Sequence, residues 1–319
     1  MMRYIIKVNK FSVSAAILWT CLLWSVSGWS QQSPVRVKVL RQQSFQKAIP
    51  PGNYSGIAWL GGNRYAVVSD KSQTDGFFIF HIDIDSVKGR IRRVENLGFR
   101  SSGLPNRDAE GIVWIPERGT VMMVGEADSR ILEYSLDGRP TGWSLQLPTA
   151  SKSQGYESLA YDAGTQKLWT MTEGDSRQLY AIDFRSSSFL NSFTYFPAPP
   201  RKQPEHGRPY AYGPSEMLAL DDGSLLVLER EVWMARSGLR ATVWCKLYRI
   251  YPENTADKQL VASWKTGLPS VPPRLANYEG MTLGPRLVDG SQTIILIADS
   301  QNRYRKLLKD WFKVIILRP

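Results

Sequence analysis

Tyr54-Ser-Gly-Ile-Ala-Trp59 is the first of five related hexapeptides in this sequence of 319 residues. Each copy has an acidic or small polar residue, a small residue, and then alternating apolar positions. The other copies are Ala109-Glu-Gly-Ile-Val-Trp114, Tyr156-Glu-Ser-Leu-Ala-Tyr161, Ser215-Glu-Met-Leu-Ala-Leu220 and Tyr278-Glu-Gly-Met-Thr-Leu283. Self-similarity at intervals of this size indicates a repeat architecture.

Each copy continues in the same way, which predicts four strands per repeat. A turn rich in Gly, Asp or Pro leads to a second apolar run that ends in an acid, at Asp70, Glu126, Glu173, Glu229 and Asp299. A third apolar segment follows, and then a weaker fourth such as residues 143–147. Repeats of this size and strand content are typical of β-propeller blades, so we predict an all-β propeller with five readable blades.

The last repeat lacks its fourth strand because the chain ends at Pro319. Residues 35–40 form an apolar-alternating segment before the first repeat, and we expect this N-terminal strand to close the ring. A sixth blade could be formed by the inserts at 185–212 or 231–245. Residues 304–312 are the best candidate for one short helix.

The repeat predicts a carboxylate cluster at one mouth of the central channel. The first two strands of a repeat form an antiparallel hairpin, so the start of one lies beside the end of the other. Because the innermost strands of a propeller line its channel, the acids at these strand ends should meet there. They are Glu110, Glu126, Glu157, Glu173, Glu216, Glu229, Glu279 and Asp299, with Asp70 as a ninth. Oxygen ligands without imidazole or thiolate favour Ca²⁺.

Cations in the loops of the same mouth are candidates for binding an anionic substrate: Arg107, Arg130, Arg177, Arg230 and Arg303. We expect the residues that break the repeat symmetry to carry function, and predict Asp108, Glu110 and Glu279 as catalytic residues. A polar residue repeated in several blades can instead be a structural clip that bonds the backbone of a neighbouring blade.

The N-terminus has the pattern of a signal peptide. Three cations precede an uncharged apolar stretch, and Gly28-Trp29-Ser30 places small residues before a cleavage point at Gln31. We therefore predict a signal peptide over residues 1–30, a single domain over residues 31–319, and a periplasmic or extracellular location; an uncleaved membrane anchor is the alternative. Cleavage lowers the net charge from +11 and leaves Cys245 as the only thiol.

Ordered along residues 50–319, the motifs resemble the phytase-like family, also described as the "esterase-like activity of phytase" family. The matching elements are Asp108-Ala-Glu110-Gly111, Gly155-Tyr-Glu157, Leu226-Val-Leu-Glu229-Arg230, Asn277-Tyr-Glu279-Gly280 and Asp299-Ser-Gln-Asn302. The resemblance implies a distant relationship to β-propeller phytases, which use Ca²⁺ at an acidic channel mouth. It thus implies a secreted hydrolase of phosphoric or related esters.

Several other chemistries are disfavoured. Two His and two Cys provide no zinc cluster and no disulfide framework, and no Gly-x-Ser-x-Gly nucleophile motif of a serine esterase occurs. The excess of basic residues has no long run that would indicate nucleic acid binding. Two alternatives to a Ca²⁺-dependent hydrolase remain: a non-catalytic binding or scaffold propeller with structural calcium, and a metal-dependent lactonase-type propeller. The partner expected is a small anionic or ester substrate.

Overall fold

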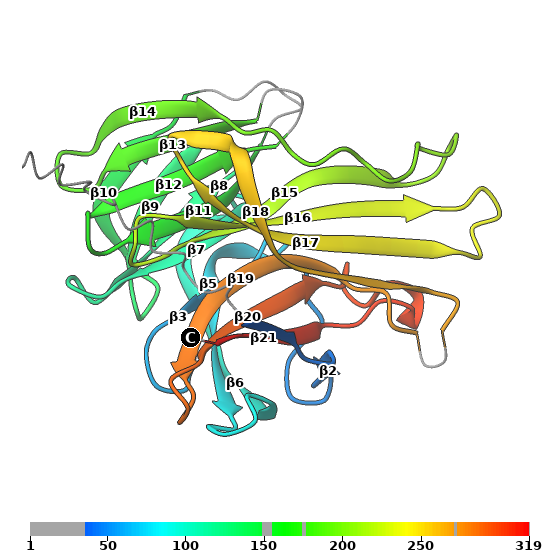
Figure 1. Cartoon of the computed structure of the whole chain (residues 1–319). Coiled ribbons are helices and arrows are strands. Elements are labelled where there is room, and N and C mark those ends of the chain that lie inside the picture. The colour runs from blue at the N-terminus through cyan, green and yellow to red at the C-terminus, as the bar shows by residue number, and fades with distance from the viewer. Residues whose placement is uncertain (1–35, 149–154, 174–176, 271–272, 319) are drawn as a thin grey trace, which may run out of the picture. The chain divides into compact units, whose positions relative to one another are not determined.

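Five antiparallel sheets build the chain, as the computed structural model shows for the residues it describes, which are 36–148, 155–173, 177–270 and 273–318. The predicted signal peptide lies outside these residues. The first four sheets follow chain order, and Figure 1 shows how they are arranged. They contain β3 (Tyr54–Trp59), β4 (Arg64–Ser69), β5 (Thr74–Ile84) and β6 (Ile91–Pro105); β7 (Ala109–Ile115), β8 (Thr120–Gly125), β9 (Arg130–Ser135) and β10 (Pro140–Gln146); β11 (Tyr156–Asp162), β12 (Lys167–Thr172), β13 (Gln178–Asp183) and β14 (Ser188–Thr194); and β15 (Tyr210–Ala219), β16 (Leu225–Met234), β17 (Ala241–Tyr251) and β18 (Asn254–Leu268).

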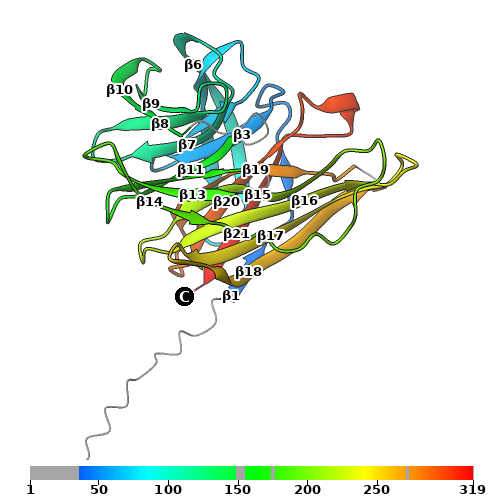
Figure 2. The ribbon, with the colours of Figure 1, turned by 90° about the horizontal axis from the view of Figure 1, so that it is seen from above.

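Residues from both ends of the described chain build the fifth sheet. It contains β19 (Asn277–Arg286), β20 (Gln292–Asp299) and β21 (Trp311–Arg318), and its outer strand is β1 (Arg36–Val39), which pairs antiparallel with β21. The short strand β2 (Gln43–Ser44) also pairs with β21. Figure 2 shows β1 beside the C-terminal end of β21. The predicted closure of the ring by the N-terminal strand is therefore confirmed.

The five first strands form the inner ring of a β-propeller. Among them, β3 contacts β7, β7 contacts β11, β11 contacts β15, β15 contacts β19, and β19 contacts β3. The ring closes after five blades, so the described residues contain no sixth blade. Of the two inserts considered for a sixth blade, residues 185–212 contain β14, the fourth strand of the third blade. Residues 231–245 contain only the hairpin between β16 and β17.

Apolar side chains on both faces of each sheet hold neighbouring blades together. Alternation along a strand sends successive side chains to opposite faces. Five buried clusters result, one between each pair of adjacent blades; for example, Val67 and Phe80 of the first blade pack with Ile295 and Phe312 of the fifth. The described residues contain no α-helix, and the segment predicted as a short helix forms only a 3-10 turn, Tyr304–Lys306, before β21. None of these residues forms a helix that could span a membrane.

A β-bulge near the start of every innermost strand corrects one part of the sequence alignment. The register of each first strand against its partner shifts by one residue, and the bulged residues are Ser55, Glu110, Glu157, Ser215 and Glu279. Ser215, and not Glu216, therefore occupies the place of the repeat acid in the fourth blade. Glu216 occupies the place that is Gly or Ser in the other four blades.

Candidate functional site

The bulges give the channel mouth its first three carboxylates. A bulge re-aims the side chain of the extra residue, and such features are common beside functional sites. Glu110, Glu157 and Glu279 come from three different blades. Even so, Glu110 lies within electrostatic range of Glu157 and Glu279, and Glu157 lies within range of Glu279. The bulged serines behave differently, because Ser55 donates a hydrogen bond to the Ala109 carbonyl and Ser215 donates one to the Tyr278 carbonyl.

The ends of the second strands bring four more carboxylates to this mouth. Asp70, Glu126, Glu173 and Asp299 all interact electrostatically with the bulged glutamates or with Asp108. Asp299 ends its strand opposite Asn277, and the other three lie one residue beyond the hairpin register of their blades; for instance, the Glu126 amide donates to the Asp108 carbonyl. Six of the eight predicted metal ligands are thus brought together, and Asp70 and Asp108 join them.

Asp70, Asp108 and Glu110 form the tightest part of the cluster. One oxygen from each carboxylate lies within 4.8 Å of the other two. Lys71 lies beside this group, with its Nζ 2.6 Å from Asp108 Oδ1 and 3.5 Å from Asp70 Oδ2. Its side chain is 56% exposed, so the ammonium can leave without unfolding the loop.

Asn106, which the sequence patterns did not single out, fixes this part of the site. Its side-chain amide donates to the carbonyls of Asp70 and Ser72, and its oxygen accepts from the Asp108 amide at 2.7 Å. Asp108 has a φ of 55°, a left-handed conformation that is uncommon for residues other than Gly. An Asn two residues before an Asp held in this way is the local signal that could have identified it.

Arg230 is the one predicted anion-binding arginine that lies within the carboxylate cluster. Its Nη1 donates to Glu279 Oε1 at 2.6 Å and to Asn277 Oδ1 at 2.7 Å, and its Nη2 lies 3.8 Å from Glu157 Oε2. Asn277 also donates to Glu279. At the end of its second strand, the fourth blade therefore supplies a cation where the other four blades supply a carboxylate.

Several carboxyl groups of the cluster have a raised pKa. Burial, followed by repulsion from neighbouring carboxylates, raises the pKa of Glu110 well above its ordinary value. Burial raises the pKa of Asp70 to about 6 and, together with Glu279, raises that of Asp299 to about 8. The pKa of Glu157 is also raised by burial, although Arg230 opposes the rise. A group of like charges gathered in this way favours a bound cation.

Glu216 and Glu229, also predicted as ligands, lie apart from the cluster. Glu216 is buried at the inner ring, where its carboxylate accepts from its neighbour Met217 at 2.9 Å and from the backbone of Leu159 and Met281 in the two adjacent blades. Glu229 accepts from the Tyr195 hydroxyl at 2.7 Å and pairs with Lys258. The hydrogen bonds of both glutamates link neighbouring blades, as expected of a structural clip.

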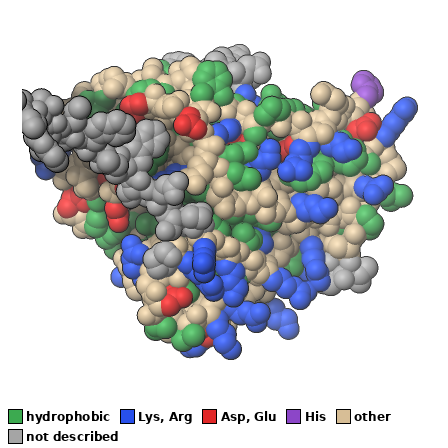
Figure 3. Space-filling model, viewed as in Figure 1, with side chains coloured by type: hydrophobic (Ala, Val, Ile, Leu, Met, Phe, Trp, Pro, Cys, Tyr) green, Lys and Arg blue, Asp and Glu red, His purple; other side chains and the backbone are tan. Residues whose placement is uncertain are grey.

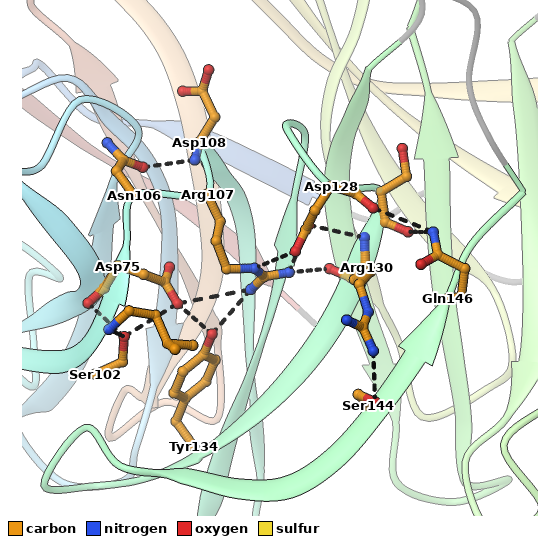
Figure 4. Close-up of polar contacts among 12 residues, drawn as sticks. Asp75, Ser102, Asn106, Arg107, Asp108, Asp128, Arg130, Tyr134, Ser144 and Gln146 are labelled. Carbon is orange, nitrogen blue, oxygen red and sulfur yellow. Dashed lines mark hydrogen bonds and ion pairs between the residues drawn. The ribbon is translucent and has the colours of Figure 1, made fainter.

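Arg107 points away from the mouth although it precedes Asp108. Figure 4 shows its guanidinium between Asp75 and Asp128, with the Asp108 carboxylate directed the other way. Arg107 makes two hydrogen bonds to Asp128, at 2.7 and 2.9 Å, and one to Tyr134 at 3.0 Å. Both residues precede β7, and the left-handed backbone of Asp108 directs its side chain away from that of Arg107.

The other three predicted arginines also have partners elsewhere. Arg130 donates to Ser144, on the exposed side of the second blade. Arg177 stacks on the Tyr212 ring, 4.9 Å from its centroid, and donates to the Tyr212 carbonyl. Arg303 pairs with the buried Asp310 and donates to the Ile49 carbonyl.

Comparison with known families decides the classification. The family described as "Phytase-like: Esterase-like activity of phytase" matches residues 49–301. The chain belongs to the phytase-like family. The match covers most of this phytase-like chain and includes every carboxylate of the mouth cluster. A search of curated proteins finds no match.

Several solved structures align with this phytase-like protein at low sequence identity. The glutaminyl cyclase of Myxococcus xanthus aligns with a TM-score of 0.47 and 12% identity, over 90% of this chain and 100% of that one. The WD40 domain of Toxoplasma gondii coronin aligns with a TM-score of 0.42 and 9% identity, over 89% and 86%. The RRP9 WD40 repeats align with a TM-score of 0.42 and 10% identity, over 89% and 100%.

Proposed function

We propose that the channel mouth binds Ca²⁺ and that the protein hydrolyses phosphoric or related esters there. The observation that carries this proposal is the meeting of carboxylates from four blades around Asp70, Asp108 and Glu110. Membership of the phytase-like family also supports hydrolysis of phosphoric or related esters.

The donor set fits a hard divalent cation. All candidate ligands are carboxylate oxygens, which Ca²⁺ prefers, and the cluster contains neither His nor Cys. Asp70 Oδ1 is buried and lacks a hydrogen-bond partner among the described residues, so it has a lone pair to offer a cation. Asp70, Asp108 and Glu110 are the residues that would hold the ion, with Glu157, Glu279 and Asp299 as further ligands.

Bound calcium would supply charge neutralisation for the ester oxygens and would acidify a nearby water. The chain's own groups would do the rest. Among the described residues, Lys71 and Arg230 are the two cations that contact the carboxylates, and they would hold the non-bridging oxygens of the substrate. Glu110 would accept a proton from the attacking water at a carboxylate oxygen.

A calcium titration with two assays tests this function. Purified protein should be stabilised by Ca²⁺ in thermal unfolding, and should release phosphate from phytate or an aryl phosphate only when Ca²⁺ is present. Glu110→Gln should abolish turnover while the protein stays folded, because the site loses a ligand and its proton acceptor. The matched control is Glu229→Gln, since Glu229 is a buried glutamate outside the cluster.

The outcomes separate the alternatives. Stabilisation by Ca²⁺ with no turnover on any ester would replace the hydrolase with a scaffold propeller that carries structural calcium. Turnover of lactones with no release of phosphate would favour a lactonase-type propeller. Absence of any response to Ca²⁺ would refute the proposed metal site.

We also propose that the protein is exported through its N-terminal signal peptide. The support is the sequence of residues 1–30, with basic residues, an apolar stretch and small residues before Gln31. N-terminal sequencing of the protein recovered from an exporting host should give Gln31 as the first residue. Retention of Met1 on membrane-bound protein would favour the anchor instead.

A further inference from the structure

A groove on the outer part of the fourth blade is lined by cations. It encloses about 660 Å³ and lies along β16, β17 and β18, the segment after β18, and neighbouring residues from both ends of the chain. Figure 3 shows Lys and Arg side chains gathered over the region where Figure 1 places these strands. No Asp or Glu among the described residues lines the groove, and its cations are Arg41, Lys202, Arg240, Lys265, Arg274 and Lys313.

These cations lack the carboxylate partners that most buried or clustered charges have. Within the ranges that the structure describes, none of the six forms an ion pair. Lys313 is buried, and its ammonium donates only to the Leu40 carbonyl, at 3.0 Å. Burial lowers the pKa of Lys313 to about 8. The ammonium also lies over the rings of Trp264 and Tyr278, at 5.6 and 5.9 Å from their centroids, but it has no counter-ion among the residues described. A buried ammonium of this kind in the lining of a basic groove favours binding of an anion.

Two indole rings add a surface for a flat group. Trp233 pairs with Thr242 in the sheet and Trp244 pairs with Glu231, so both side chains lie on one face. Lys202 Nζ lies 5.6 Å from the centre of the Trp233 ring, and Trp233 Nε1 is buried without an acceptor among the described residues. Among the described residues, no aromatic ring and no cation stacks on the Trp244 ring.

We propose that this groove binds a multiply phosphorylated small molecule that carries a flat ring, of the nucleoside polyphosphate class. Three guanidinium groups offer paired N–H donors that match phosphate oxygens, and three ammonium groups add charge without such directionality. A ring stacked on Trp244 would contribute as bases do on exposed aromatic side chains. The groove is separate from the carboxylates of the channel mouth, and its ligand requires no metal.

Equilibrium binding in the presence of a chelator tests the groove without involving the mouth. ATP and inorganic tripolyphosphate are titrated into the purified protein, with calorimetry or Trp fluorescence as the readout. The test variant is the pair Arg240→Glu and Lys265→Glu. The control is the pair Arg64→Glu and Arg185→Glu, which has the same change of charge at exposed positions on other blades.

The test pair should weaken both ligands by at least about tenfold, because two charged hydrogen bonds are lost and repulsion is gained. The control pair should change affinity by less than about threefold, as distant exposed charges are screened. Trp244→Leu should weaken ATP by about tenfold and leave tripolyphosphate unchanged. Absence of binding by the unaltered protein, or equal losses in the test and control pairs, would overturn the proposal. Equal affinity for ATP and tripolyphosphate would overturn the ring contact.

Discussion

Arg230 is the only arginine in the described part of the chain that contacts the mouth carboxylates, and its replacement by Met gives a sharp test of the cluster. The substitution keeps most of the side-chain volume but removes the bonds to Glu279 and Asn277 and the charge beside Glu157. The carboxylates then repel one another without compensation. We expect the protein to fold but to lose stability in a way that depends on pH and on Ca²⁺.

The size of the loss follows from the burial of the pair. Removing one partner of a buried ion pair costs about 3–5 kcal/mol. A loss of about 4 kcal/mol corresponds to a fall of about 6 °C in Tm for a chain of this length. The folded-state pKa values of Asp70 and Asp299, about 6 and about 8, exceed the ordinary value, so ionisation of these groups costs stability as the pH rises through them. The loss in the variant should therefore be largest near pH 8, and near pH 5 it should shrink to about half.

Thermal unfolding at these two pH values, with and without Ca²⁺, measures the effect. Arg107→Met is the matched control, because Arg107 is a buried arginine paired with Asp75 and Asp128 outside the cluster. Both variants should lose stability, but Ca²⁺ should restore only the Arg230 variant by supplying the missing positive charge. Equal recovery of both variants, or a loss that is the same at pH 5 and pH 8, would refute the reasoning.

Three further predictions concern other parts of the molecule. Affinity for Ca²⁺, measured by calorimetry, should fall as the pH is lowered from about 8 to about 5, because protons compete for Asp70 and Asp299 as the pH passes their raised pKa values; a constant affinity would contradict the proposed ligands. Glu216→Leu should lower the free energy of unfolding in urea by about 2–4 kcal/mol, since backbone donors at the inner ring lose their acceptor, and an unchanged midpoint would argue against the clip. Deleting residues 36–39 should lower Tm and produce oligomers in size-exclusion chromatography, because the edge of β21 becomes free to pair with other chains; a monomer of unchanged Tm would count against this.

The repeat made the fold predictable from sequence. Periodic apolar runs, turn residues and spacing determine the blades, and they also indicated that residues 35–40 would complete the last one. The carboxylate cluster was predictable for the same reason, because residues at equivalent places in a repeat meet around the axis. Glu110, Glu157 and Glu279 are brought together as this logic requires.

Details below the level of the repeat were not accessible. The sequence aligned Glu216 with the other glutamates, whereas the bulge places Ser215 there; Ser55 in the first blade was the signal that a serine can hold this position. The positions of the arginines could not be predicted for a related reason. Arg107 pairs with the buried Asp75 and the partly exposed Asp128, and Arg303 pairs with the buried Asp310; only the packing of the chain reveals these partners.

The pairing of β1 with β21 also has a consequence for how the protein folds. Arg36 lies opposite Arg318, so the last blade requires a contact between residues at the two extremes of the described chain. Bringing residues so distant in sequence together has a large entropic cost of loop closure, and folds rich in non-local pairs form slowly. Four blades can form from local hairpins as the chain lengthens, but the fifth must wait for its final strand. Until then the backbone donors and acceptors of β1 are unpaired. During synthesis this edge therefore needs protection from pairing with other chains.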